Sequence, residues 1–474
     1  MVGVRRIGAI ASVAGAVLLL GACAGGPAPS GPVATTGSAS TGTTPGPSAS
    51  EDGYAHSPNA RRVANVPLSA PFDGEEAWGT DLAFQGDFAF SGNYEGFTIH
   101  DISDPAKPKV VTRVVCPGGQ NDISVSGNLL FLSVDEPRDD DTCESGHGDE
   151  NEGWEGIRIF DISDKTHPRY IRSLATSCGS HTHTLVPGKD AANVYLYVSS
   201  FGPFPDSVNC KPPHDSIAIV EVPVTDPAKA RIVAQPVLFT DGNDESKPGA
   251  TSGCHDITVY PEKDLAAGAC LGNGILMDIS DRTAPKVLQE ITDTENFSIW
   301  HSATFSNDAS QVIFSDELGG GVSPTCDAKT GPTRGADAVY DISSDGKLKR
   351  RGYFKIPRYQ TAAENCVAHN GSLLPVPNKT IMVQAWYQGG VSVIDFTDAD
   401  HPKELAYVDP GPLSTTGEPK LGGSWSAYYY NGYIYSSDII KGLDVIALDD
   451  PLTDPAKSVK LDELNAQTQV SYPE

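Results

Sequence analysis

Histidines recur at one place in the repeated units of this chain. Four consecutive units carry a histidine at the start of their first predicted strand, namely His183, His255, His301 and His369, and His181 stands two residues before the first of these. Imidazole is the commonest protein ligand for zinc, copper, iron and nickel, and ligands on adjacent rigid strands fix a coordination geometry. The pattern predicts a transition-metal site built from these five histidines, with copper or zinc as the expected ion.

Two other interpretations of the polar residues remain open. A water-filled channel, whose histidines hydrogen-bond to neighbouring strands, accounts for the same pattern. An acidic stretch at residues 135–156 offers oxygen ligands of the kind that Ca²⁺ prefers: Asp139, Asp140, Asp141, Asp149 and Glu150. Their spacing matches no EF-hand loop, and a run of charges is usually a solvated surface, so calcium is expected less than copper or zinc.

The elements that would position the histidines come from a repeated phrase. Residues 96–111 read GFTIHDISDPAKPKVV, and the phrase returns at 156–171, 274–288 and 390–405, with looser copies at 216–233 and 337–354. A glycine, a β-rich run, a proline-containing turn and a second β-rich run are typical of a hairpin. Recurrence at roughly 50–60 residues is typical of four-stranded propeller blades. These six copies and a seventh unit that starts at Trp425 predict an all-β fold, a seven-bladed β-propeller of four-stranded antiparallel blades.

Closing the ring requires a fourth strand for the last unit. We expect residues 61–68 (RRVANVPL) to supply it, while the tail at 458–464 competes for the same place, and the sequence does not decide between them. The long insertions fall almost entirely in connections that emerge on one face of a propeller, where loops on a rigid scaffold commonly carry binding sites. Since inner strands line the central channel, the histidines are expected at its mouth, beneath these insertions.

The repeats resemble a known family. The segments at 97–103, 157–163, 275–280 and 391–397, each followed by a proline, are similar to those of the LVIVD-repeat β-propellers of bacterial surface proteins, and the likeness extends from about residue 61 to residue 450. The resemblance implies a propeller but no activity, because propellers host unrelated functions. An exported propeller with histidines is also similar in plan to the copper-dependent methanethiol oxidase (selenium-binding protein) family, without a residue-by-residue match of ligands.

The N-terminus has the features of an export signal. Two arginines precede an apolar run at residues 7–20, which is shorter than a comfortable membrane span. The following Leu20-Gly21-Ala22-Cys23 resembles a bacterial lipobox, so residues 1–23 are expected to be a lipoprotein signal peptide and Cys23 the lipidated (palmitate-bearing) residue. An ordinary signal peptide is the alternative. Residues 24–55, rich in Gly, Pro, Ser and Thr, predict a flexible tether, which leaves 56–474 for the propeller.

Eight cysteines remain after Cys23 is set aside. In an exported protein an even number favours disulfides, and the absence of any CxxC pair argues against a thiolate metal site. Most of them lie either just before an inner strand or within a nearby insertion, so pairing in sequence order staples each loop to adjacent structure. The predicted bridges are Cys116–Cys143, Cys178–Cys210, Cys254–Cys270 and Cys326–Cys366.

The charge of the chain bounds its partners. With 61 acidic and 34 basic residues the net charge is −27, which excludes nucleic acid because its phosphates would be repelled.

The export signal and the lipobox at Cys23 predict a protein on the outer face of the cell membrane, held there by its lipid anchor, and we expect it to be a monomer. Either it holds a transition metal, with oxidoreductase activity on a small molecule as an extension, or it binds a protein or glycan through the insertion-rich face without catalysis. Whether it is an enzyme stays open.

Overall fold

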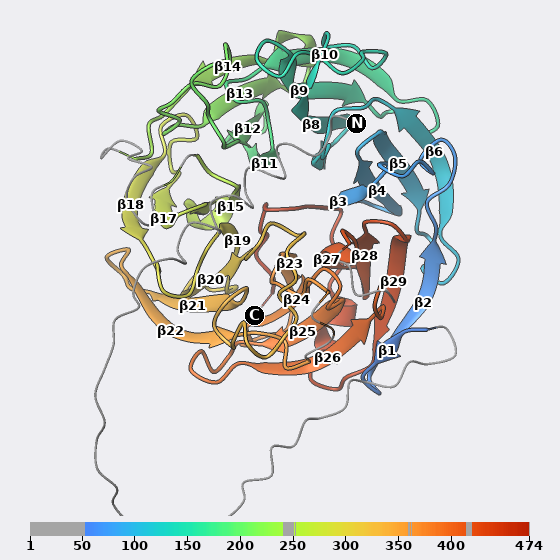
Figure 1. Ribbon diagram of the computed structural model, residues 1–474, viewed down its shortest axis with the longest axis vertical. Helices are drawn as coiled ribbons and strands as arrows, with labels where there is room; N and C mark the ends of the chain where they lie inside the picture. Colours follow the sequence, from blue (N-terminus) through green and yellow to red (C-terminus); the bar gives the residue numbers. More distant parts are fainter. Residues whose placement is uncertain are drawn as a thin grey trace, which may run out of the picture.

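The sheets of this protein stand side by side in a ring, and the region that their inner strands enclose is called the channel below (Figure 1). The computed structural model describes residues 53–239, 251, 253–358, 361, 363–413 and 420–473. The predicted signal peptide with Cys23, and the tether up to residue 52, lie outside the described residues. Within them, the regular structure is β-strand with three short 3₁₀ turns, and no helix has the length and apolar character needed to span a bilayer. The all-β prediction is confirmed.

Four sheets, and a fifth with one extra edge strand, consist of strands consecutive in the sequence. Their strands are β3 (Gly79–Gln85), β4 (Phe88–Asn93), β5 (Gly96–Asp101) and β6 (Lys109–Val115); β7 (Ile123–Ser126), β8 (Leu129–Arg138), β9 (Trp154–Asp161) and β10 (Arg169–Ala175); β11 (Thr182–Pro187), β12 (Asn193–Ser199), β13 (Ala218–Pro223) and β14 (Arg231–Ala234); β15 (Asp256–Tyr260), β16 (Leu265–Cys270), β17 (Asn273–Asp278) and β18 (Lys286–Ile291); and β19 (Trp300–Phe305), β20 (Gln311–Asp316), β21 (Asp337–Ile342) and β22 (Leu348–Phe354).

The sixth sheet has nine strands and joins two four-stranded arrays. Short parallel pairing between their innermost strands, at Asn370↔Ser426 and Gly371↔Ala427, links the two arrays. One array runs through β23 (Asn370–Leu373), β24 (Ile381–Ala385), β25 (Val391–Asp395) and β26 (Lys403–Asp409), with β1 (Ala55–His56) on its outer edge. The other runs through β27 (Ser424–Tyr430), β28 (Tyr433–Asp438), β29 (Gly442–Leu448) and β2 (Ala60–Val66).

The repeated phrase encodes the outer hairpin of an array. Its opening glycine allows a close approach: a Cβ on Gly96 would lie 2.0 Å from the carbonyl oxygen of Val114 on the outer strand, and one on Gly156 would lie equally close to Leu174. Both glycines have positive φ, which other residues rarely adopt. The aspartate of Asp-Ile-Ser forms the turn, since Asp101 Oδ1 accepts a hydrogen bond of 2.9 Å from the backbone N–H of Ser103. The phrase therefore specifies the scaffold and not the site.

The N-terminal candidate closes the ring. Strand β2 pairs antiparallel with β29, from Ala60↔Leu448 to Val66↔Leu443, and so becomes the outer strand of the last array. The competing tail forms β30 (Glu463–Asn465) instead and pairs with the inner strand β3, with Gln85 opposite Glu463. Strand β2 therefore lies at the outer edge of its array and β30 at the inner edge of another.

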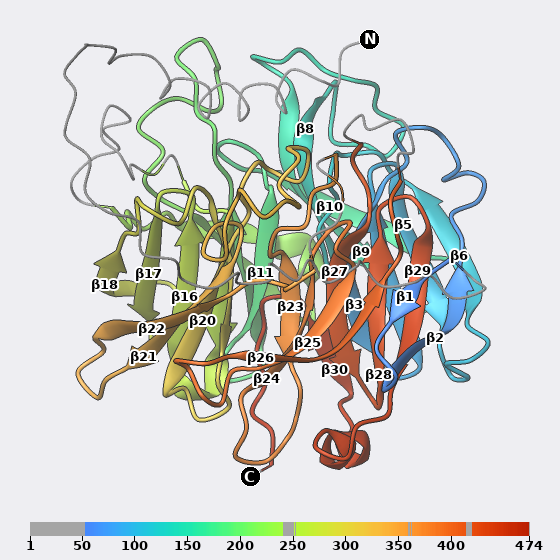
Figure 2. The ribbon, with the colours of Figure 1, turned by 60° about the horizontal axis from the view of Figure 1, so that its bottom comes forward.

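After β30 the tail crosses the channel. The Asn465 side chain bonds both backbone groups of Val125 in β7, at 2.7 and 2.9 Å, and Gln469 does the same for Phe305 in β19, at 2.8 Å each. Thr468 Oγ1 donates to the carbonyl of Leu185 in β11. In Figure 2 strand β30 lies at one end of the ring, and the extended β8 and the insertion loops lie at the other. The tail thus spans the channel at the end away from the insertions.

All four predicted disulfides are confirmed. The bridges join Cys116 to Cys143, Cys178 to Cys210, Cys254 to Cys270 and Cys326 to Cys366, with sequence separations of 27, 32, 16 and 40 residues. Each connects an insertion or a strand end with a segment that leads into an inner strand (β7, β11, β15 or β23). These covalent links hold the insertion-rich face to the scaffold.

Candidate metal centre

Four histidines occupy equivalent positions where the inner strands begin. His181, His255 and His369 each stand one residue before their strand, β11, β15 or β23, and each donates its backbone N–H to the end of the second strand, at 2.9, 2.9 and 3.0 Å. His301 is the second residue of β19, beside an irregularity in the pairing of that strand. The propeller geometry therefore brings one imidazole from each of four successive arrays to one end of the channel.

His183 does not belong to this group. Its Nε2 lies 2.7 Å from Ser124 Oγ and its Nδ1 lies 2.8 Å from Ser133 Oγ, so both ring nitrogens already have partners on the neighbouring sheet. In the sequence Ser-His-Thr-His, either His181 or His183 could be the equivalent of His255 and His369, because residues two apart on a strand face the same way. The structure assigns that position to His181, two residues earlier than predicted.

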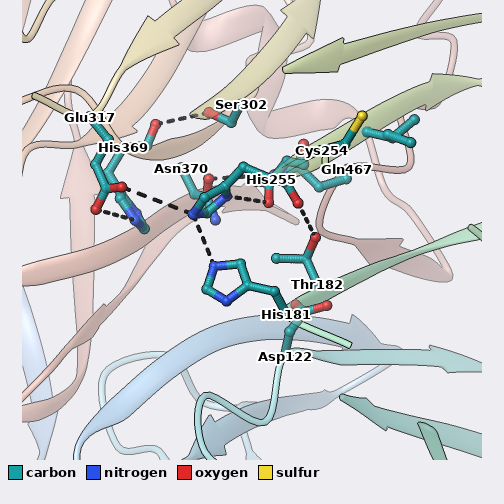
Figure 3. Close-up of polar contacts among 12 residues, drawn as sticks. Asp122, His181, Thr182, Cys254, His255, Ser302, Glu317, His369, Asn370 and Gln467 are labelled. Carbon is teal, nitrogen blue, oxygen red and sulfur yellow. Dashed lines mark hydrogen bonds and ion pairs between the residues drawn. The ribbon is translucent and has the colours of Figure 1, made fainter. Parts of the chain in front are cut away.

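The four imidazoles form a row. Ring centroids lie 4.3 Å apart for His181–His255, 4.0 Å for His255–His301 and 4.0 Å for His301–His369. All four residues are buried. Figure 3 shows His181 pointing towards His255, with His369 on the far side. Phe201, from an insertion, stacks on His255 with an interplanar angle of 18°.

A glutamate that the sequence analysis missed completes the group. Glu317 directly follows β20, and its carboxylate oxygens lie 4.0 Å from His255 Nε2 and 3.9 Å from His369 Nε2. One ligand atom each from His255, His301 and Glu317 lie within 4.8 Å of one another. Tyr387 fixes the carboxylate, because its hydroxyl donates to Glu317 Oε1 at 2.5 Å. Glu317 escaped detection because it follows a second strand, whereas the histidines begin first strands.

The outer nitrogens of two histidines face carboxylates. His181 Nδ1 lies 2.8 Å from Asp135 Oδ2, and His255 Nδ1 lies 3.1 Å from Asp256 Oδ1. Metal-binding histidines in proteins commonly donate their second N–H in this way. When both Nδ1 atoms donate, both Nε2 atoms present lone pairs, and these two atoms face each other at 2.9 Å. Two lone pairs at that distance need a proton or a cation near them.

His301 gives the most direct sign of a missing partner. The residue is 1% exposed, and neither ring nitrogen has a hydrogen-bond partner. A buried polar group without a partner costs about 1–3 kcal/mol, and such groups are rare in native proteins. Its imidazole lies between those of His255 and His369, beside the Glu317 carboxylate. The donor set of imidazoles and one carboxylate fits a transition-metal ion in both chemistry and spacing.

Burial keeps the histidines in their ligating form. It lowers the pKa of His369 to about 3 and holds the pKa of His255 and of His301 well below the usual value for histidine. Burial raises the pKa of Glu317 to about 7, against the effect of the Tyr387 hydrogen bond, which lowers it. At neutral pH His255, His301 and His369 are therefore neutral, and among the proposed ligands Glu317 is the one whose pKa lies near 7.

This difference predicts how metal affinity depends on pH. Below about pH 7 a metal ion must displace one proton from Glu317, so the affinity should fall about tenfold for each pH unit between 7 and 5, and it should level off above 7. Equilibrium titration with Zn²⁺ in non-chelating buffers from pH 5 to 8 measures this slope. A Glu317→Gln variant, which lacks the titrating group, should bind weakly with a flatter profile. An affinity for the wild type that is constant over this range would contradict the assignment of Glu317.

A small cavity adjoins the histidines, partly open to solvent and with about 10 Å³ of space for the centre of a water-sized sphere. It is lined by Thr80, Asp81, Gln120, Asp122, Thr182, His255, Asp256, His301, His369, Asn370 and Trp425. From the far end, the tail reaches this level, since Gln467 Nε2 donates to Asp256 Oδ2 at 2.8 Å. The tail therefore contacts Asp256, one of the residues that line the cavity beside the candidate metal centre.

The acidic stretch 135–156, the candidate calcium site, does not gather its carboxylates around one point. Among the described residues, His255, His301 and Glu317 form the group of three or more potential ligands that lie close enough for one ion. The acidic stretch 135–156 contributes no such group. Asp140 Oδ1 instead accepts bonds from the backbone and hydroxyl of Thr142, and Asp149 Oδ1 accepts one from the N–H of Asn151. These carboxylates organise the turns of their own loop.

Part of the chain matches a known family of repeats. The LVIVD repeat model matches residues 79–115 and 152–176, which contain strands β3–β6 and β9–β10, so the resemblance to LVIVD-repeat proteins is confirmed over these two stretches. No curated protein matches the chain.

Several solved structures match the chain at low sequence identity and with TM-scores below 0.5. The β-propeller domain of Cps50 (Swd1) from Myceliophteria thermophila is 11% identical, with a TM-score of 0.48 over 77% of this chain and 96% of that one. The computationally designed protein Ika8 is 10% identical, with a TM-score of 0.45 over 82% and 99%. A protein from Lactobacillus plantarum is 10% identical, with a TM-score of 0.46 over 76% and 88%.

Proposed function

We propose that this chain, a β-propeller with LVIVD repeats, binds one transition-metal ion at the mouth of its channel through His255, His301 and Glu317. His181 and His369 adjoin these ligands and complete the donor set as the ion requires. The observation that carries the proposal is His301, a buried imidazole with two unpartnered nitrogens in the middle of a row of histidines.

We further infer that the ring has seven blades. Five sheets contribute one four-stranded array each, and the nine-stranded sheet contributes two, joined through β23 and β27. The two arrays of that sheet each have an inner strand, two middle strands and an outer strand, like the other five. In this count the closing strand β2 belongs to the seventh blade.

The donor set narrows the choice of metal. Two imidazoles and one carboxylate leave open positions, an arrangement used by catalytic zinc and by non-haem ferrous iron, while further imidazoles favour copper. When bound, such an ion supplies Lewis-acid or redox chemistry. In that chemistry Tyr387 would hold the Glu317 carboxylate, and Asp135 and Asp256 would fix the ring orientation of His181 and His255. Oxidation or reduction of a small molecule that enters from the insertion-rich face is the proposed use.

Elemental analysis of the purified protein tests the proposal. We expect close to one equivalent of zinc, copper or iron per chain after purification without chelators, and its recovery when stripped protein is reloaded with the same ion. A protein that retains less than about a tenth of an equivalent under every loading condition would refute metal binding at this site.

We also propose that the protein is exported and anchored by Cys23 to the outer face of the cell membrane. Four disulfides in one domain support export, because such bonds persist in oxidising compartments. Metabolic labelling with palmitate should mark the wild type and not the Cys23→Ala protein. Equal labelling of both would contradict the lipid anchor.

A further inference from the structure

A second cavity lies at the seam where the ring closes. It is small, with about 20 Å³ of space for the centre of a water-sized sphere and part of it open to solvent, and it is bordered by the first array, by β28 and β29, and by residues 66–68. These last residues carry the chain from the closing strand β2 towards β3. Figure 1 shows β2 between β29 and β6 at the rim. The cavity is thus separate from the channel and from the histidine row.

The charge of this cavity is opposite to that of the protein. Arg113, on the outer strand β6, is the one charged residue in a lining that also contains His100, Ser91, Thr98 and Ser437, and no carboxylate belongs to it. The chain as a whole carries a net charge of −27, so a cavity lined by an arginine alone stands out. Three glycines, Gly79, Gly92 and Gly442, also belong to the lining, and at Gly92 and Gly442 a Cβ would lie only 2.4 and 2.2 Å from neighbouring backbone oxygens.

Two buried polar atoms of the lining have no hydrogen-bond partner. His100 is 4% exposed, and its Nδ1 is unpartnered, as is the hydroxyl of Ser91. Both residues border the cavity, on the adjacent strands β4 and β5. Burial and the nearby guanidinium lower the pKa of His100 to about 3, so its imidazole is neutral at physiological pH and offers one N–H donor.

The guanidinium has capacity for a ligand as well. Arg113 Nη2 donates to Ser69 Oγ at 2.7 Å, which uses one of its five N–H groups and holds the side chain against the segment that follows β2. The fork of a guanidinium matches the two oxygens of a carboxylate or phosphate, and such charge-assisted bonds are roughly twice as strong as neutral ones.

From these observations we propose that the seam cavity binds a small oxyanion, a carboxylate or a phosphate, between Arg113, His100 and Ser91. The anion accepts from the Arg113 guanidinium, from the imidazole N–H of His100 and from the hydroxyl of Ser91. Because the lining comes from the first array, from β28–β29 and from the segment after β2, the bound anion holds the closing strand to both sides of the seam. Ligand binding and ring closure are therefore coupled.

The test uses purified protein at low ionic strength, titrated separately with acetate and with phosphate against equal ionic strengths of chloride. We expect one of the two oxyanions to raise the Tm until the effect saturates, and calorimetry should show binding of one equivalent. Comparison of the acetate titration with the phosphate titration shows which of the two the cavity prefers. An Arg113→Gln variant should bind at least about tenfold more weakly, because the charge-assisted pair is lost. His100→Phe removes the imidazole donor and should weaken binding as well.

Arg172→Gln is the matched control. Arg172 is a half-buried arginine on the outer strand β10 of the next array, where it donates to a backbone carbonyl and lies outside the cavity. Its removal should leave the affinity unchanged. If neither acetate nor phosphate binds more strongly than chloride, or if Arg113→Gln binds as tightly as Arg172→Gln, the cavity holds only water and the proposal is wrong. Because the cavity is separate from the histidines, this result is independent of the metal content.

Discussion

The His255→Ala/His301→Ala protein is expected to lose stoichiometric metal. These residues supply two of the three ligand atoms that lie within 4.8 Å of one another, and the remaining Glu317 cannot hold an ion alone. Loss of a partner in the second coordination sphere already costs roughly 10–100-fold in metal affinity, so the loss of two direct ligands should exceed that range. Elemental analysis and competition with a chromophoric chelator measure the change.

Two comparisons show whether this loss is specific. In His167→Ala/His401→Ala the substituted side chains are 83% and 77% exposed, so the protein should keep its full metal content. Tyr387→Phe keeps all ligands but removes the hydroxyl that positions Glu317, and it should weaken binding by roughly 10–100-fold. A double variant that is folded by circular dichroism and retains its metal would place the ion elsewhere.

Of the four disulfides, the Cys326–Cys366 bridge should cause the largest loss of stability when it is removed. It closes a 40-residue loop, and the loop-entropy relation gives about 4 kcal/mol for a bridge of that span. Cys366 stands three residues before His369, and the bridged insertion begins directly after Glu317. Within that insertion Gly321 packs against the ring of Tyr387. The Cys326→Ser/Cys366→Ser protein should therefore unfold at lower denaturant concentration and also bind metal more weakly.

The Cys116–Cys143 bridge separates these two effects. It closes 27 residues, for about 3.5 kcal/mol, and it links the connection between β6 and β7 to the insertion between β8 and β9, neither of which contains a proposed ligand. Cys116→Ser/Cys143→Ser should lower the unfolding midpoint by a similar amount and leave metal affinity unchanged. Equal metal affinities for both double variants would show that the Cys326–Cys366 bridge has no role in positioning the site.

The parts of the molecule that repeat were predictable from the sequence, and the parts that do not repeat were not. The glycine and aspartate of each phrase are imposed by backbone geometry, at Gly96 and Asp101 for example, so the hairpins could be recognised and arranged in a ring. The disulfides followed because a bridge between an insertion and the adjacent strand leaves few pairings. The same periodicity placed three of the four channel histidines correctly.

The errors arose where the periodicity stops. The choice between His181 and His183 depends on which residue makes the first pair with β12, and a strand pattern with a period of two does not distinguish them. Glu317 reaches the centre from the residue after a second strand, a position that the repeated histidines do not occupy. The tail after β30 lies across several inner strands through side-chain bonds, from Asn465 to Gln469, that leave no hydrophobic pattern in the sequence.

The N-terminal strands also determine where a mechanical force would enter this protein. A pull on the chain ahead of Ala55 acts first on β1, which is paired with β26 at only two positions, Ala55↔Asp409 and His56↔Val408. The next element to bear the load is β2, whose pairing with β29 closes the ring. Tension applied at this end would therefore open the ring at its seam, while the row of histidines lies on strands β11, β15, β19 and β23 and their approaches, several arrays further along the chain.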